Sequence, residues 1–194
     1  MRHLPNLICL ARIALIWPVV SALRAGDYTT ALVLFGIAAI SDGLDGFLAK
    51  RFNWASELGK FLDPVADKLL LMTVFVTATW LGLVPWWLTA AAVARDVLIG
   101  LGALVFRLWF GPLHGRPRVP SKINTALQLG YLLCVMVNAA SGYPTEGWLT
   151  TLAVITFGTT VISGADYVIA FTRRAWNMPV APSTSPPATG ERTR

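Results

Sequence analysis

Four aspartates occur in two pairs whose spacing is suited to a metal site. Asp42 and Asp45 are three residues apart, and Asp63 and Asp67 are four apart. On a helix, both spacings place side chains on one face. A short connection would make the two helices antiparallel neighbours, so that the four carboxylates converge. Carboxylates in such a cluster repel one another, and hard divalent ions such as Mg²⁺ or Mn²⁺ take carboxylate oxygens as ligands. The pattern therefore predicts a divalent metal site that could hold two ions.

Ion pairing offers a simpler explanation for each aspartate taken alone. Four cations lie close to them in the sequence, namely Lys50, Arg51, Lys60 and Lys68. This explanation is less favoured for all four aspartates together than a shared metal site. Gly46, Ala49 and Gly59 lie one helical turn from the aspartates and would leave room for a ligand or allow close helix packing.

The composition indicates a membrane protein that crosses the bilayer several times. Of 194 residues, 55% are hydrophobic and only 13% are charged, whereas a soluble domain has about 25% charged residues. The stretches 69–94 and 123–145 contain no charge, and each exceeds the roughly 18 residues of a membrane-spanning helix. Disordered, collagenous and disulfide-rich secreted proteins are excluded. Cys9 and Cys134 lie in apolar stretches, so we expect buried thiols without redox chemistry.

The expected fold is all-α, a polytopic membrane protein with six transmembrane helices. They are placed at residues 7–24, 28–50, 59–83, 85–110, 122–142 and 147–172. Residues 1–174 would form one membrane domain. Residues 175–194 are rich in proline and small polar residues, which predicts a disordered cytoplasmic tail.

The net charge of +6 is interpreted as a topology signal and not as a nucleic-acid surface. Most cations cluster at one set of helix ends, which the positive-inside rule makes cytoplasmic, so both termini are expected in the cytoplasm. Trp86, Trp87 and Trp148 fall at the opposite ends, where indole rings favour the headgroup level. A cleaved signal peptide is a competing interpretation of the first helix, but Arg12 inside the apolar run argues against it.

Two further acids, Asp96 and Asp166, fall within predicted spans. Asp96 follows Arg95 directly, and adjacent residues on a helix point in different directions. We therefore expect Arg95 and Asp96 to have separate partners. Asp166 is expected to be a structural hydrogen-bonding residue.

The aspartates form part of a longer pattern, Asp42-x-x-Asp45-Gly46-x-x-Ala49-Lys50, then eight residues, then Gly59-x-x-x-Asp63-x-x-x-Asp67. This pattern resembles the signature of the CDP-alcohol phosphotransferase (CDP-alcohol phosphatidyltransferase) family, six-helix membrane enzymes that join an alcohol to the phosphoryl group of a CDP-linked donor. Lys50 stands where the family usually has arginine, which keeps the charge and loses bidentate phosphate geometry.

The resemblance implies roles for individual residues. Asp42, Asp45, Asp63 and Asp67 would bind the metals, two ions of Mg²⁺ or Mn²⁺, and Asp67 would also deprotonate the attacking hydroxyl. The CDP-lipid donor would be contacted by Asn6, Gly46, Lys50, Ser56 and Gly59. Arg95 and Lys122 would bind the acceptor.

Other segments refine the resemblance. Pro5-Asn6-x-x-Cys9-x-x-Arg12 is similar to the opening of the phosphatidyltransferase branch, and Arg95-Asp96 together with Ser121–Gln128 is similar to CMP-forming cardiolipin synthases. This implies CDP-diacylglycerol as donor and phosphatidylglycerol as acceptor, giving cardiolipin and CMP. The alternative acceptor is glycerol 3-phosphate, giving phosphatidylglycerophosphate. A bacterial inner (plasma) membrane, a cytoplasmic active site and a possible homodimer complete the expectation.

A small cation transporter is the remote alternative, with intramembrane aspartates lining an ion path. Such a path needs polar groups across the whole membrane. The four aspartates instead cluster toward one end, which favours the enzyme.

Overall fold

The computed structural model describes residues 4–52, 59–110 and 119–176, with side chains for 11–41, 66–102, 104–105 and 120–172. These stretches are all-helical, which confirms the all-α part of the predicted fold class. The six helices are α1 (Leu4–Arg24), α2 (Tyr28–Phe52), α3 (Gly59–Trp80), α4 (Trp86–Phe110), α5 (Val119–Ser141) and α6 (Glu146–Trp176). The predicted boundaries agree to within a few residues, because long apolar runs fix the helices.

The turn between α1 and α2 is closed by local hydrogen bonds. Gly26 has a φ of 76°, a left-handed conformation that a glycine adopts without steric cost. The amide of Asp27 donates to the carbonyl of Ala22 at 3.0 Å. The Asp27 carboxylate accepts from the amide of Thr30 at 3.0 Å and so caps α2. Hydrogen bonds from Thr30 lower the pKa of Asp27 below its ordinary value of 3.8.

α3 ends three residues earlier than predicted, at Trp80 and not at residue 83. Gly82 has a φ of 74°, and its amide donates to the carbonyl of Thr79 at 3.0 Å while the amide of Leu83 donates to Ala78 at 2.9 Å. These two bonds form a Schellman cap, which terminates a helix. The apolar run continues beyond the cap, so hydrophobicity alone placed the boundary too late.

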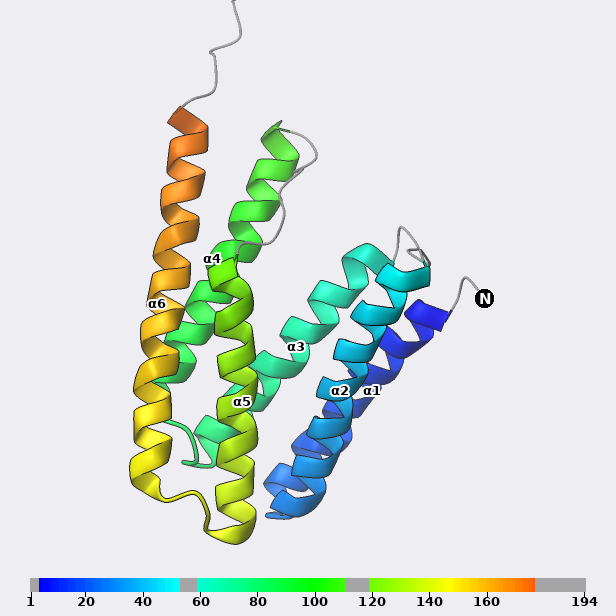
Figure 1. Ribbon diagram of the computed structural model, residues 1–194, viewed down its shortest axis with the longest axis vertical. Helices are drawn as coiled ribbons and strands as arrows, with labels where there is room; N and C mark the ends of the chain where they lie inside the picture. Colours follow the sequence, from blue (N-terminus) through cyan, green and yellow to red (C-terminus); the bar gives the residue numbers. More distant parts are fainter. Residues whose placement is uncertain (1–3, 53–58, 111–118, 177–194) are drawn as a thin grey trace, which may run out of the picture.

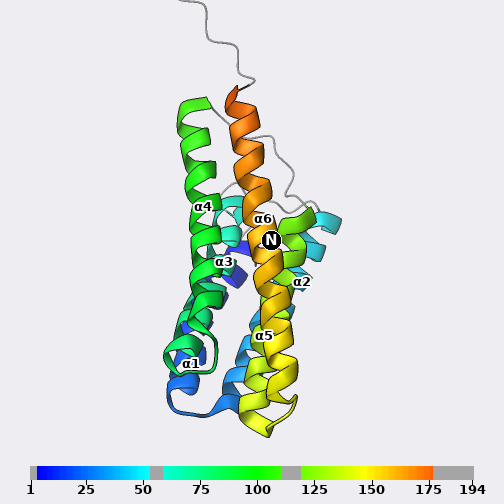
Figure 2. The same cartoon turned by 90° about the vertical axis from the view of Figure 1, so that its left-hand side faces the viewer.

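The helices pack as two groups of three. α1 packs against α2 and α3, as an integral helix of the bundle does, and α6 packs against α4 and α5. The contact between α2 and α5 is the most extensive one between the groups, with smaller contacts from α3 to α4 and α5. Figures 1 and 2 show α4, α5 and α6 side by side, with α1–α3 leaning away toward the upper end of Figure 1.

The core is apolar and draws on all six helices. Its largest fully buried apolar side chains are Tyr131, Phe35, Phe75, Leu23, Leu88, Leu132 and Met136. Many large apolar side chains also point outward, among them Ile37, Ile40, Leu101, Val154 and Ile162. An outer surface of this kind is typical of a protein in contact with lipid and would promote aggregation in water.

Two helical segments within the described residues are long and apolar enough to cross a bilayer, Pro120–Ser141 and Glu146–Thr172. Only 33% and 22% of their most apolar windows are buried, so the larger part of each window is accessible, whereas the core helix of a soluble protein is mostly buried. Tyr28–Ser41 is a shorter apolar segment. Six membrane crossings therefore remain a prediction.

The helix ends agree with the predicted alternation. In Figure 1 the first turn of α1 and the last turn of α6 are the upper ends of their helices, whereas the connections α1–α2, α3–α4 and α5–α6 lie toward the lower end. Trp86 and Trp148, at the starts of α4 and α6, are 74% and 67% exposed. Trp87 is less exposed and meets the ring of Phe157 edge-on, with centroids 5.2 Å apart. α6 extends to Trp176, and the rest of the predicted tail lies outside the described residues.

Candidate functional site

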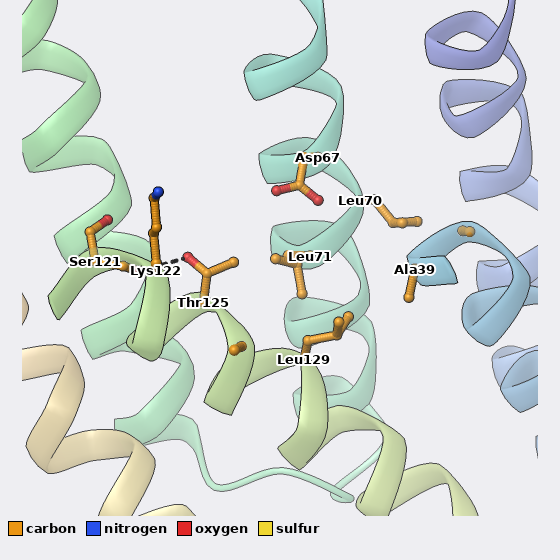
Figure 3. A pocket seen from close by; sticks show the side chains of 10 residues that line it. Ala39, Asp67, Leu70, Leu71, Ser121, Lys122, Thr125 and Leu129 are labelled. Atoms are coloured by element: carbon orange, nitrogen blue, oxygen red, sulfur yellow. Dashed lines mark hydrogen bonds between the residues drawn. The ribbon is translucent and has the colours of Figure 1, made fainter. Parts of the chain in front are cut away.

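A cleft of about 420 Å³ opens between α3 and α5, with α2 at its edge. Its polar side chains are Asp67 on α3 and Ser121, Lys122 and Thr125 on α5. The remaining lining residues are apolar, namely Ala38, Ala39, Leu70, Leu71, Ala126 and Leu129. Figure 3 shows Asp67 and Lys122 toward one end of the cleft and Leu129 toward the other. A cleft that is polar at one end and apolar at the other suits an amphipathic ligand.

Helical periodicity explains both main walls of the cleft. Asp67, Leu70 and Leu71 are separated by three and four residues, so they share one face of α3. On α5, Ser121 and Thr125 are four apart, and the hydroxyl of Thr125 donates to the carbonyl of Ser121 at 3.1 Å. The two alanines of α2 occupy little volume and leave the cleft open at that edge.

Lys68, the neighbour of Asp67, forms an ion pair with an aspartate on another helix. Its ammonium lies 3.0 Å from both carboxylate oxygens of Asp96 on α4. It also donates to the hydroxyl of Thr125 at 3.4 Å. The ion-pair alternative from the sequence therefore fails for this lysine, whose counter-ion comes from another helix.

Arg95 and Asp96 each have a partner of their own, as expected, and they are also joined to each other, which the sequence did not predict. Arg95 Nη1 donates to Asp96 Oδ1, and Nη2 donates to the hydroxyls of Ser121 and Ser163, each at 2.7 Å. Their side chains are only 3% and 6% exposed. Adjacent residues on a helix point in different directions, but the arginine side chain is long enough to bend back and reach the carboxylate of its neighbour.

The predicted acceptor residues occupy different environments. Lys122 is exposed and lines the cleft. Arg95 is 5% exposed and does not belong to the lining of this cleft. Both terminal nitrogens of its guanidinium already donate hydrogen bonds to protein side chains, and one of these is the cleft residue Ser121. Arg95 as an acceptor ligand therefore stays a prediction from the resemblance.

Most other predicted site residues have side chains outside the described set. The backbone places Asp42 and Asp45 toward the end of α2 and Asp63 in the second turn of α3, and these two helix ends lie at the same end of the molecule (Figure 1). Ser56 lies outside the described residues entirely. Only the backbone is described for Asn6, Asp42, Asp45, Gly46, Lys50, Gly59 and Asp63. Convergence of the four carboxylates stays a prediction.

The residues with described side chains include no group of three potential metal ligands. Of the four predicted ligands, Asp67 is the one with a described side chain, and its carboxylate lines the open cleft (Figure 3). A carboxylate in this position can coordinate a hard cation and still reach a substrate. The carboxylate oxygens of Asp67 are therefore suitable ligands for the expected divalent ion.

Sequence reasoning assigned no role to Ser121, Thr125 or Lys68 at the cleft. Ser121 and Thr125 belong to the run that resembles cardiolipin synthases, and their spacing of four on a predicted helix indicates a shared polar face. No sequence signal pairs Lys68 with Asp96, because the two residues lie 28 positions apart on different helices.

The sequence of this chain is similar to a known protein family and to several of its members. Residues 2–162 match the sequence pattern of the CDP-alcohol phosphatidyltransferase family. The chain is 31% identical over 182 residues to a cardiolipin synthase (CMP-forming) of Rattus norvegicus, an alignment that covers 84% of this chain and 60% of the relative. The chain thus spans about 60% of the length of that relative.

Bacterial relatives are covered more completely. Identity to a cardiolipin synthase (CMP-forming) of Streptomyces coelicolor is 29% over 189 residues, covering 88% of this chain and 83% of the relative. Identity to a probable phosphatidylglycerophosphate synthase of Mycobacterium tuberculosis is 31% over 180 residues, with 86% and 80% covered. The relatives therefore agree on the type of transferase and differ in the acceptor.

Proposed function

Because the chain belongs to the CDP-alcohol phosphatidyltransferase family, we propose that it transfers the phosphatidyl group of CDP-diacylglycerol to phosphatidylglycerol, forming cardiolipin and CMP. The observation that carries this proposal is the cleft between α3 and α5. Its carboxylate and its ammonium stand at one end of an apolar channel. These groups match an acceptor that carries a hydroxyl and a phosphate on a lipid tail.

Asp67 acts in this proposal as the general base. The acceptor hydroxyl oxygen attacks the phosphorus that carries the diacylglycerol, the bond from that phosphorus to CMP breaks, and the hydroxyl proton passes to the Asp67 carboxylate. Lys122 holds the phosphate of the acceptor through a charge-assisted contact. Positioning of the two reactants and neutralisation of charge supply most of the rate enhancement in such a transfer.

Divalent ions, Mg²⁺ or Mn²⁺, supply neutralisation of the pyrophosphate charge when bound. We assign their coordination to Asp42, Asp45, Asp63 and Asp67. The CDP part of the donor is assigned to Asn6, Gly46, Lys50, Ser56 and Gly59. Both assignments rest on the resemblance, and the placement of Asp67 in the cleft supports the first.

Phosphatidylglycerol is favoured over glycerol 3-phosphate by the apolar lining of the cleft and by the Ser121–Gln128 segment. Glycerol 3-phosphate is small and dianionic and would call for several cations. The cleft lining contains one cation, Lys122, among the described residues. A relative named phosphatidylglycerophosphate synthase keeps glycerol 3-phosphate as the alternative.

We place the protein in the inner (plasma) membrane with this cleft toward the cytoplasm. Cations gather at the helix ends that surround the first turns of α3 and α5, which the positive-inside rule assigns to the cytoplasmic side. CDP-lipids and membrane acceptors would reach the cleft from the same leaflet.

The test is a CMP-release assay on the purified protein with CDP-diacylglycerol and Mg²⁺ or Mn²⁺, comparing phosphatidylglycerol with glycerol 3-phosphate. Release with phosphatidylglycerol alone is expected. Asp67→Asn should reduce turnover by on the order of 10²- to 10⁴-fold, the usual contribution of a general base, in a protein that still folds. Release with glycerol 3-phosphate alone would reverse the acceptor assignment. Ion flux into vesicles without any CDP-lipid would favour the transporter instead.

A further inference from the structure

A chain of polar side chains connects the two main walls of the cleft. Its arginine and aspartate side chains are only 3% and 6% exposed, and its lysine side chain is 32% exposed. Lys68, Asp96 and Arg95 form this chain, which we call the brace. The brace begins next to Asp67 on α3, passes through α4 and ends at Ser121 on α5. None of the three brace residues is part of the cleft lining.

Both ends of the brace hold residues that do line the cleft. Lys68 donates to Thr125 at 3.4 Å, and Arg95 donates to Ser121 at 2.7 Å. Arg95 also reaches Ser163 on α6 at 2.7 Å, so its guanidinium ties three helices together. Ser121 and Thr125 stand opposite Asp67 across the cleft (Figure 3).

Asp96 is the centre of the brace. Its carboxylate, 6% exposed, accepts hydrogen bonds from Lys68 and from Arg95, so two cations share one anion. In a buried, weakly polarisable environment such contacts are strong and their geometry is tightly defined. Removal of this carboxylate would release both cations at once, and with them both contacts to α5.

We infer that Asp96 is a positioning residue that holds Lys68 and Arg95 against Thr125 and Ser121, and so fixes the α5 wall of the cleft relative to Asp67. Asp96 touches no cleft ligand and acts through these neighbours. The inference rests on the proposed function only in taking the cleft as the place of reaction. Displacement of a reacting group by about 1 Å can cost on the order of 10²-fold in rate.

A double-mutant cycle on kcat/KM for CMP release tests the inference. Asp96→Asn is expected to lower kcat/KM at least tenfold per folded molecule in the wild-type background. In the Ser121→Ala/Thr125→Val background, where the brace has no side-chain hydroxyl on α5 to hold, the same change should cost less than threefold. Equal losses in both backgrounds would overturn the inference, because independent effects multiply.

A second variant covers the case in which Asp96→Asn does not fold. Lys68→Gln leaves Asp96 paired with Arg95 and removes only the Thr125 arm. Its effect should vanish in a Thr125→Val background and persist in a Ser121→Ala background. Thr160→Val is the matched control, since it removes a buried hydroxyl between α5 and α6 outside the cleft lining and should leave KM for either substrate unchanged.

A readout without catalysis separates this inference from the proposed function. Ala126→Cys, introduced after replacement of both native cysteines, places a thiol in the cleft lining. Asp96→Asn should change its rate of modification by a charged thiol reagent at least threefold, and Thr160→Val should not. An unchanged rate would overturn the brace whatever the substrate proves to be. A changed rate in a protein inactive toward both acceptors would support the brace and contradict the proposed function.

Discussion

Two polar clusters meet on α5, and they differ in the kind of group that they contain. The brace is built from full charges and borders the cleft. The second cluster is neutral and lies between α5 and α6, where Asn124 Oδ1 lies 3.0 and 2.8 Å from the hydroxyls of Thr159 and Thr160. Gln128 donates to Thr160 at 3.5 Å.

The neutral cluster satisfies itself largely through its own helix. The hydroxyls of Thr159 and Thr160 also lie 3.0 and 2.7 Å from the carbonyl of Thr156, so each has a second acceptor available for its one proton. They would therefore keep a partner without Asn124. The brace has no such reserve for Asp96, because two cations depend on one carboxylate. The comparison indicates that loss of one member should destabilise the neutral cluster only modestly, whereas loss of Asp96 should destabilise the brace strongly.

The largest expected effect is on the brace. Asp96→Leu leaves Arg95 and Lys68 without their shared counter-ion. Removal of one partner from a buried ion pair costs about 3–5 kcal/mol, and this cost applies to the buried pair of Arg95 and Asp96. The free energy of unfolding, measured with denaturant in detergent micelles, should fall by that amount. A loss no larger than that of an exposed substitution would mean that the two clusters are equivalent.

The next effect concerns function and not stability. Lys122→Met should raise KM for the acceptor roughly tenfold, because one charge-assisted hydrogen bond is lost. Stability should not change, since Lys122 is exposed. CMP-release kinetics with each substrate varied in turn provide the measurement. A higher KM for CDP-diacylglycerol alone would move Lys122 to the donor side.

A smaller effect is expected for the neutral cluster. Asn124 Nδ2 is buried and has no hydrogen-bond partner, so Asn124→Leu removes an unsatisfied donor together with an acceptor that Thr159 and Thr160 can replace with the carbonyl of Thr156. Replacement by an apolar group of similar shape can be nearly neutral, and we expect a change below about 1 kcal/mol in the free energy of unfolding. A loss as large as that of Asp96→Leu would remove the distinction between the clusters.

The smallest effect lies outside both clusters, at the cap of α2. Asp27→Ala should lower the melting temperature slightly at neutral pH, because the amide of Thr30 loses its acceptor. The lowered pKa of Asp27 means that the ionised form is favoured in the folded state. The advantage of the wild type is present above the ordinary pKa of 3.8 and is lost as the pH falls through the lowered value. Thermal melts of both proteins between pH 7 and the acid limit of solubility would check this.

The sequence by itself determined the all-helical class, the approximate helices and the family signature, because each depends on local periodicity or on fixed spacing. Asp67 could be predicted as a cleft residue for the same reason. The end of α3 was missed, since the left-handed conformation of Gly82 stops the helix within an apolar run.

Only the tertiary structure decided which charges meet. Lys68 selects Asp96 over the adjacent Asp67, and Arg95 reaches Ser121 and Ser163 across 26 and 68 positions of sequence. These choices depend on the rotation and axial register of each helix against its neighbours. Rotation and register are set by the packing of the whole bundle, and no local pattern in the sequence contains that information.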